Sequence, residues 1–338
     1  MLKALVFLQK NLVFAIPVAM VLGLLGGGFV FDAKPLKALI IPVTFVMIYP
    51  MMTTLNVRSV FSGKDTKLQV TTQLINFVLI PIIVFTIGKL FLNGEEAKFG
   101  LWAVGLFLIG VLPASGMTIS WTGFANGNKE AATKMLVLGL IIGSAAAPVY
   151  TRIFMGAIVD VDMLHMFQQI CIFVFAPLLA GLATQTYLVK KHGKQAWMES
   201  YKPKFPPFSA LGVVLIAFLA MSLKAKSILA NPADLLTIVI PLVIFYLVSY
   251  TLLSVIGKLF FSREDAIAMV FGVVMRDLSI ALAIAMTAFG KEGSTIALLI
   301  AMAYIFQIQS AAWYIKLVPW IFGRDEQQAT LVEAEAAN

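Results

Sequence analysis

Long apolar runs alternate with short polar connections along most of this chain. Charged and turn-forming residues bracket ten such runs, and each approaches the length of about 20 residues that a transmembrane helix requires. The runs cover Leu12–Val30, Leu36–Leu55, Leu68–Leu92, Gly100–Ala125, Ala131–Met155, Leu164–Val189, Phe208–Leu223, Leu235–Phe261, Ala266–Gly290 and Ser294–Ile315. The pattern predicts an all-α polytopic membrane protein with ten transmembrane helices, numbered spans 1 to 10 in chain order.

The composition supports this prediction and excludes several other classes of protein. Of the 338 residues, 60% are hydrophobic and 12% are charged, whereas a soluble domain has about 45–50% apolar and about 25% charged residues. These figures exclude an ordinary soluble enzyme, a disordered chain and a nucleic-acid-binding domain. The net charge of +8 therefore indicates no nucleic-acid partner. We interpret it as a consequence of membrane topology, with the lipid bilayer as the expected surroundings.

The positive charges are distributed unevenly between the two sides of the predicted membrane. Of the 25 Lys and Arg residues, 16 lie on the side of the N-terminus and 8 on the other side. Because positive connections remain cytoplasmic, we expect both termini to be cytoplasmic and the protein to lie in the plasma (inner) membrane. The polar connection at 189–207 carries five lysines and is predicted to be a cytoplasmic linker loop between spans 6 and 7.

A weak internal repeat divides the chain into two halves. The segment IGKLF ends span 3 at Ile87–Phe91 and ends span 8 at Ile256–Phe260, and TGFANGNKEA and TAFGKEGS follow in the same order. We therefore predict a first five-helix repeat at 1–160, a second at 161–323 and an acidic tail at 324–338. With five spans in each half the second repeat is inverted, an architecture typical of secondary transporters with midplane sites on broken helices.

Two charged residues lie deep inside a predicted span. Arg276 and Asp277 follow the start of span 9 by about ten residues, which places them roughly 15 Å into a hydrocarbon core of about 30 Å. A charge there costs at least about 2.5–3.5 kcal/mol. Neighbouring residues on a helix do not face each other, so unwound backbone or separate partners are implied. The two residues could bind substrate or carry protons. Alternatively they could pair with each other, or form hydrogen bonds to backbone carbonyls, and so serve only the packing of helices.

Span 4 is disturbed at the equivalent place in the first half. Pro113 removes a backbone donor and should break the helix near the midplane, and small polar residues follow it at Ser115, Thr118 and Ser120. A helix N-terminus freed by the break offers unpaired N–H groups to an anion. A proline kink whose hydroxyls bond back to the helix is the alternative. Two disturbed spans at equivalent positions favour a binding site.

No sequence motif indicates catalysis, a metal or a cofactor. The chain has one cysteine, Cys171, and contains no HExxH or GxSxG segment and no paired Cys or His ligands. An intramembrane enzyme would need Ser115 as its nucleophile, but no His or Lys base lies deep inside any span. We therefore expect no enzyme activity, no cofactor and no metal site. The glycines at Gly23–Gly28 predict close helix contact rather than phosphate binding.

Four segments resemble a known transporter family. They are VTFVMIYPMMTTLNV (Val43–Val57), LIGVLPASGMTISWTGFANGNKEA (Leu108–Ala131), PLLAGLATQTYLVKKHG (Pro177–Gly193) and FGVVMRDLSIALAIAMTAFG (Phe271–Gly290). They are similar to the arsenite efflux permease family, within the bile acid:sodium symporter superfamily. The resemblance implies inverted five-helix repeats, a core domain from spans 3–5 and 8–10, a panel domain from spans 1, 2, 6 and 7, and broken helices 4 and 9 that cross.

The chain departs from the arsenite family directly after the span 4 proline. That family has a cysteine there, expected to engage trivalent arsenic, and this sequence has Ala114. Thiolate is the natural soft ligand for such a species, and Cys171 lies in a different span. The resemblance therefore does not carry the family's cysteine mechanism to this chain.

Span 9 departs from both branches of the superfamily. Where the arsenite family has two asparagines and then a glutamate, this chain has Arg276, Asp277 and Ser279. The positions that hold sodium ligands in the sodium-coupled branch correspond to Gly272, Arg276 and Ile119. A fixed positive charge replaces oxygen ligands. We infer that Arg276 substitutes for a bound cation and that transport is not sodium-coupled.

These observations predict a secondary transporter that works by alternating access. We expect Arg276 to hold a metalloid or oxyanion substrate and Asp277 to carry the coupling proton. The expected substrate-binding residues are Arg276, Pro113, Ala114, Ser115, Gly116, Thr118, Ser120, Asn76 and Gln307; interhelical hydrogen bonding would explain the last two equally well. Organic-anion transport is the alternative, and a non-transporting receptor is a third interpretation. The sequence does not indicate an oligomeric state.

Overall fold

The computed structural model is helical and describes residues 2–55, 65–159, 162–230 and 232–323, in which there is no strand. Within these residues seven helices are long and apolar enough to cross a membrane, or eight if the bent pair Leu2–Lys10 and Phe14–Val30 forms one span. The structure therefore indicates a multi-pass membrane protein. The predicted tail at 324–338 and the predicted repeat boundary at 160–161 lie outside the described residues.

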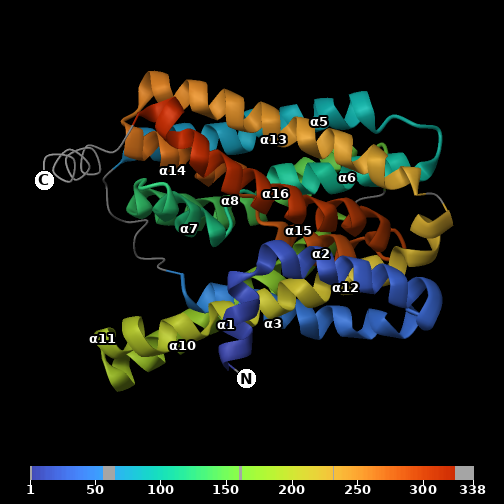
Figure 1. Ribbon diagram of the computed structural model, residues 1–338, viewed down its shortest axis with the longest axis horizontal. Coiled ribbons are helices and arrows are strands. Elements are labelled where there is room, and N and C mark those ends of the chain that lie inside the picture. Colours follow the sequence, from blue (N-terminus) through green and yellow to red (C-terminus); the bar gives the residue numbers. More distant parts are fainter. Residues whose placement is uncertain (1, 56–64, 160–161, 231, 324–338) are drawn as a thin grey trace, which may run out of the picture.

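Most helices run along the long axis of the molecule in two layers (Figure 1). The upper layer contains α4 (Thr66–Leu74), η4 (Ile75–Leu79), α5 (Ile80–Phe91), α6 (Ala97–Val111), α7 (Met117–Phe124), α8 (Lys129–Met155), α13 (Ala233–Phe260), α14 (Arg263–Val274) and α16 (Gly293–Phe322). The lower layer contains α1 (Leu2–Lys10), α2 (Leu12–Leu25), η1 (Gly26–Val30), η2 (Lys34–Leu39), α3 (Ile40–Thr53), α10 (Ala176–His192), α11 (Lys194–Ala196), η6 (Trp197–Tyr201), η7 (Lys202–Lys204) and α12 (Pro206–Ala230). Where the layers meet lie α9 (Met163–Ile170), η5 (Cys171–Phe175) and α15 (Leu278–Ala288).

Seven predicted spans correspond to the seven long helical segments, of which span 9 is itself divided into α14 and α15. The other three spans differ. Span 1 is bent by 97° against the entry helix α1. Span 4 is divided into α6 and α7, of 15 and 8 residues, each too short to cross alone. Span 6 is formed by α9, η5 and α10. The total of ten spans, and the naming of the layers as core and panel domains, stay predictions.

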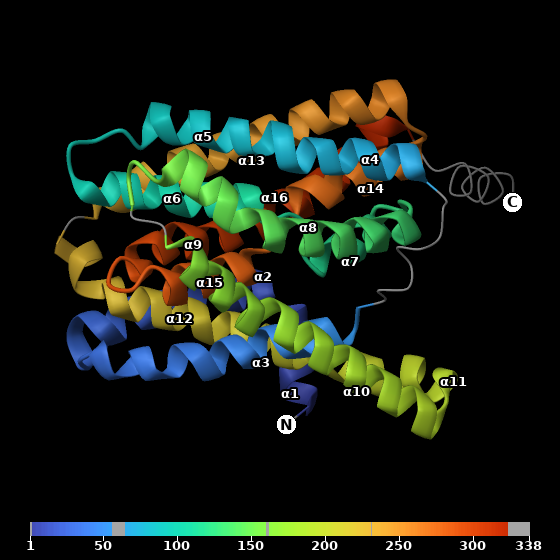
Figure 2. The same ribbon diagram turned by 180° about the vertical axis from the view of Figure 1, so that it is seen from behind.

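The order of elements recurs in the two halves of the upper layer. A long helix, a broken helix and a second long helix follow each other in α4–α5, α6–α7 and α8, and again in α13, α14–α15 and α16. The paired long helices α4–α5 and α13 lie side by side and run in opposite directions (Figures 1 and 2). Inversion of all five spans in each half stays a prediction.

The structure describes two further predicted features: the connection at 189–207 and the glycines of span 1. The connection at 189–207 is helical for most of its length, because α10 continues to His192 and the chain after Gly193 forms α11, η6 and η7. The glycines of span 1 allow α2 to approach α12 closely: a Cβ added at Gly23 would lie 2.5 Å from the carbonyl oxygen of Phe218. This confirms that the glycine run permits close helix contact.

Candidate functional site

The two helix breaks predicted from the sequence lie against each other at the centre of the molecule. One separates α6 from α7, and the other separates α14 from α15. The backbone N–H of Ser115 donates to the carbonyl of Met275 at 2.9 Å, and that of Asp277 donates to the carbonyl of Leu112 at 3.0 Å. These reciprocal hydrogen bonds satisfy backbone groups that the breaks leave unpaired, and they join the two halves of the chain.

The break after α6 has a clear local cause. Pro113 has no N–H to donate and its ring fixes φ, so the helix ends before it. Ala114 has a φ of +56°, a left-handed conformation that costs a residue with a Cβ of order 1–3 kcal/mol. Ala114 is fully buried, and its backbone redirects the chain into α7. Pro113 and Ala114 thus shape, through the backbone, the place where the two helix breaks meet. We call this place the crossing.

Arg276 is fully buried beside this crossing, and its guanidinium is surrounded by oxygen atoms. Nε donates to the carbonyl of Ile109 at 2.9 Å, and one terminal nitrogen donates to Oδ1 of Asn76 at 2.6 Å and to the carbonyl of Val273 at 2.8 Å. The other terminal nitrogen donates to the carbonyl of Gly110. The three carbonyls belong to the last turns of α6 and α14. The guanidinium therefore lies at two helix C-termini, where the dipoles favour a cation.

The surroundings of Arg276 bear on the two interpretations of this charge. Among the described residues it forms no ion pair, so Asp277 does not neutralise it. It bonds backbone carbonyls, as the packing interpretation expects. All four hydrogen bonds of the guanidinium go to protein oxygens. Contact between Arg276 and a substrate therefore stays a prediction.

Asn76 and Gln307 are both brought to Arg276, and both are fully buried. Oε1 of Gln307 accepts from the backbone N–H of Arg276 at 2.9 Å, and its Nε2 donates to the carbonyl of Arg276 at 3.1 Å. Tyr246 on α13 donates to the same Oε1 at 3.1 Å. Sequence reasoning missed Tyr246. Its spacing with Tyr250 and Ser254, one turn and two turns later on one helix face, was the available signal.

Asp277 uses its two carboxylate oxygens differently. Oδ1 accepts from the backbone N–H of Ile280 at 3.1 Å and caps α15. Oδ2 is buried and has no hydrogen-bond partner among the described residues, and the hydroxyl of Ser115 is in the same state. An unsatisfied buried oxygen is costly, by about 1–3 kcal/mol. The crossing thus has polar groups able to bind a proton or a polar ligand.

The three other predicted residues of span 4, Thr118, Gly116 and Ser120, have different surroundings. The hydroxyl of Thr118 lies 3.4 Å from the carbonyl of Phe271 on α14, so it joins the two broken helices. Gly116 is half-buried and faces the lower layer, since an added Cβ would lie 3.5 Å from Met51 on α3. Ser120 is exposed on α7, one turn beyond the crossing, and is not brought to Arg276.

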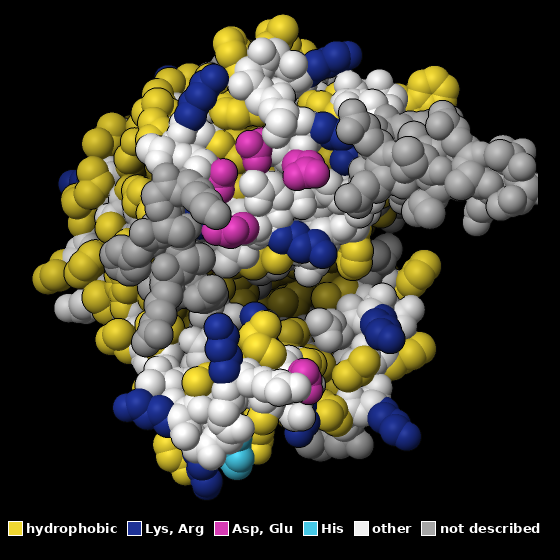
Figure 3. All heavy atoms as spheres, turned by 90° about the vertical axis from the view of Figure 1, so that its left-hand side faces the viewer, with side chains coloured by type: hydrophobic (Ala, Val, Ile, Leu, Met, Phe, Trp, Pro, Cys, Tyr) yellow, Lys and Arg dark blue, Asp and Glu magenta, His cyan; other side chains and the backbone are white. Residues whose placement is uncertain are grey.

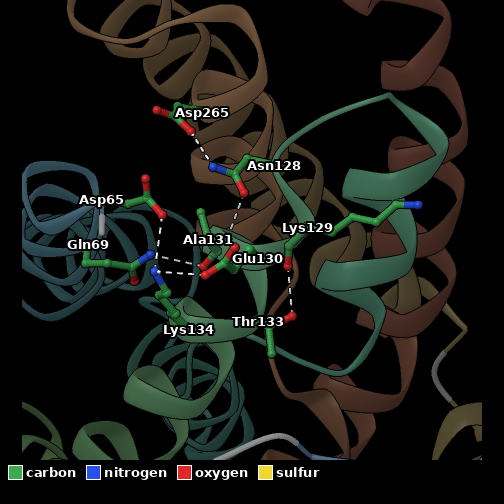
Figure 4. Close-up of polar contacts among 9 residues, drawn as sticks. All are labelled: Asp65, Gln69, Asn128, Lys129, Glu130, Ala131, Thr133, Lys134 and Asp265. Atoms are coloured by element: carbon green, nitrogen blue, oxygen red, sulfur yellow. Dashed lines mark hydrogen bonds and ion pairs between the residues drawn. The ribbon is translucent and has the colours of Figure 1, made fainter. Parts of the chain in front are cut away.

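A second polar cluster lies where α4, α8 and α14 begin (Figure 4). Lys134 is 1% exposed and pairs with Asp65 at 3.2 Å and with Glu130 at 3.6 Å. Asn128 caps α8 and donates to Asp265 at 2.8 Å. The burial of Lys134 could not be predicted from the sequence, because only the fold brings Asp65 against it. The cluster holds three helix N-termini together.

The end of the molecule near this cluster is hollowed between the two layers. Figure 3 shows apolar side chains within the hollow, acidic side chains gathered on the upper lobe, and Lys and Arg side chains spread around the lower lobe. Acidic side chains are therefore concentrated on the upper lobe, whereas Lys and Arg side chains occur on both lobes.

Comparison with known proteins gives a family and three relatives. The Sodium Bile acid symporter family matches residues 41–231, which include the break in span 4. An uncharacterized transporter of Synechocystis is 24% identical over 316 residues, covering 87% of this chain and 82% of the relative. Arsenical-resistance protein Acr3 of Corynebacterium glutamicum is 21% identical over 310 residues, covering 85% and 82%. Acr3 of Alkaliphilus metalliredigens is 25% identical over 210 residues, covering 59% and 58%.

Proposed function

Because the chain belongs to the Sodium Bile acid symporter family, a family of transporters, we propose that it is a secondary transporter for a small, oxygen-rich solute. Transport is sodium-independent and coupled to protons, and it proceeds by alternating access between the upper and lower layers. The protein lies in the plasma (inner) membrane with both termini cytoplasmic. Metalloid or oxyanion efflux is the first candidate reaction.

The observation that carries this proposal is the oxygen cage around Arg276. Two helix C-termini and the side chain of Asn76 direct four oxygens at the guanidinium. Carbonyl and amide oxygens are also the ligands that cations such as sodium bind at broken transporter helices. Arginine cannot lose its charge in a protein, so it acts as a permanent cation in this position. A transporter with this built-in charge has no need of sodium at the same place.

We assign the solute to the other side of the crossing, where α7 and α15 begin. Helix N-termini favour anions and polar oxygens, and the unpartnered oxygens of Ser115 and Asp277 lie at these two ends. Asp277 is the buried carboxylate nearest to this place, so it takes the coupling proton. A direct contact between Arg276 and the solute would require the cage to open during transport.

Organic-anion transport is the second candidate, and Ala114 favours it. Two relatives are arsenical-resistance proteins by name, but this chain has no thiol beside Pro113 to bind trivalent arsenic. A thermal-shift comparison of arsenite and a bile acid on the purified protein separates the candidates. Stabilisation by arsenite alone supports metalloid transport, and stabilisation by the bile acid alone supports organic-anion transport. Absence of any transport of a stabilising probe would favour the receptor interpretation.

The purified protein is expected to show no specific stabilisation by sodium. A ligand that binds the native state raises stability by about 2.7 kcal/mol at a concentration 100 times its dissociation constant, so an occupied sodium site would be visible. The measurement compares melting temperatures in detergent with sodium chloride and with choline chloride at equal ionic strength. Equal melting temperatures support the proposal, and a saturable rise with sodium alone would contradict it.

A further inference from the structure

A surface pocket of about 480 Å³ lies in the lower layer, outside the crossing. One wall is α3, with Phe45 and Val46, and the other is the start of α12 with the turn before it, where Phe205 and Phe208 lie. Its volume is within the range of about 300–1,000 Å³ that small-molecule sites occupy. Its walls are almost entirely apolar, so an occupant must bury a hydrocarbon part there.

The rim of this pocket is positively charged. Lys204 lines it, and the Nζ of Lys204 lies 5.2 Å from the ring centre of Tyr201. The surrounding connection carries five lysines and a single acidic residue, Glu199. Among the described residues none of these lysines forms an ion pair. Figure 3 shows the basic side chains of this lobe spread around its surface. The pocket therefore combines an apolar interior with an uncompensated positive rim.

The predicted topology puts the connection at 189–207, which lines part of this pocket, at the cytoplasmic edge of the bilayer. Tyr201 of η6 and Lys204 of η7 line it, and these two turns connect the end of α10 to the start of α12. Tyr201, which lines the pocket, is a residue type enriched at membrane interfaces, whereas Trp197 is buried against Phe205. Basic pockets on the cytoplasmic side of transmembrane helices bind anionic lipid head groups. A site with this volume, apolar lining and charge suits a phospholipid better than a dissolved solute.

We propose that this pocket binds one anionic phospholipid. An acyl chain lies between α3 and the start of α12, and the phosphate lies at Lys204, with Lys202 beside it. The occupant bridges two helices of the lower layer and stabilises their packing. This proposal is independent of the transported solute, because no lining residue belongs to the crossing of the broken helices.

The test uses full-length protein that has been stripped of lipid in detergent, with binding followed by native mass spectrometry and melting temperature. Three probes separate the sources of affinity: phosphatidylglycerol, phosphatidylcholine with the same acyl chains, and soluble glycerol phosphate. Phosphatidylglycerol is expected to bind and raise the melting temperature, phosphatidylcholine to bind more weakly, and glycerol phosphate to have no effect. Equal binding of the two lipids, or stabilisation by glycerol phosphate alone, would overturn the proposal.

Two variants test the two parts of the pocket separately. Lys204→Gln is expected to weaken phosphatidylglycerol binding about fivefold, the equivalent of about 1 kcal/mol for a lysine near a lipid surface, and to leave phosphatidylcholine unchanged. Val46→Trp fills the apolar part and is expected to abolish binding of both lipids. Lys226→Gln, at the other end of α12, is the matched control with wild-type binding. Unchanged phosphatidylglycerol binding in Lys204→Gln rejects the site even if Val46→Trp does not fold.

Discussion

Replacing Arg276 by alanine is expected to lower the stability of the protein by about 3 kcal/mol or more, since it leaves buried oxygens without their cation. The carbonyls of Ile109, Gly110 and Val273 and the amide oxygen of Asn76 would then converge on a cavity. Such a cavity is itself a cation site. Sodium or guanidinium ions at millimolar concentration are therefore expected to restore part of the lost melting temperature.

The matched control for this variant is Arg263→Ala. Arg263 also donates to two carbonyls, those of Gly323 and Asn126, but it does so at the surface, so its loss should change the melting temperature little. Arg276→Lys keeps the charge with fewer and shorter-reaching donors and should fall between wild type and Arg276→Ala. A melting temperature of Arg276→Ala equal to that of the control, with no response to either ion, would show that the cage has no structural role.

Changing Asp277 to asparagine is expected to uncouple transport from protons while the fold is retained. Asparagine caps a helix about as well as aspartate, so the hydrogen bond from Ile280 to this side chain is kept. The amide cannot take up a proton at Oδ2. Transport driven by a pH gradient should fall at least about tenfold, a change equivalent to about 1.4 kcal/mol. Exchange of solute across the membrane without a gradient should continue.

The measurement for Asp277→Asn uses proteoliposomes and whichever of arsenite or the bile acid stabilises the purified protein. Uptake under a pH gradient and solute exchange are compared in the same preparation. Glu264→Gln removes a carboxylate at the exposed start of α14 and should behave as wild type in both assays. Asp277→Ala also loses the cap and should cost about 1 kcal/mol of stability. Full pH-driven transport by Asp277→Asn would remove Asp277 from the coupling step.

The parts of the site that could be predicted from the sequence are those with a strong local or energetic cause. A proline such as Pro113 lacks a backbone hydrogen-bond donor in any fold. A charge inside an apolar run, such as Arg276, has a high free-energy cost of burial in any fold. Both therefore mark the crossing without knowledge of the fold. The long helices follow from apolar runs in the same way, since hydrocarbon requires internally bonded backbone.

The partners of these residues could not be predicted. The oxygens of Ile109 and Gly110 belong to the main chain, and every residue carries such an oxygen, so nothing in the residue types distinguishes them. Lys134 looks like an edge charge because Asp65, its partner, comes from another helix. Ser120 looks like a member of the site because it is close in sequence to Ser115, but the turn of α7 exposes it. Contacts between distant segments decide all of these cases.

In the proposed mechanism a fixed guanidinium replaces the coupling cation and protons drive transport. The most direct test is solute accumulation by wild-type proteoliposomes under imposed gradients, measured with the stabilising probe. Accumulation should follow a pH gradient and remain unchanged when choline replaces sodium on both sides. Accumulation driven by a sodium gradient alone, with no response to pH, would contradict this mechanism.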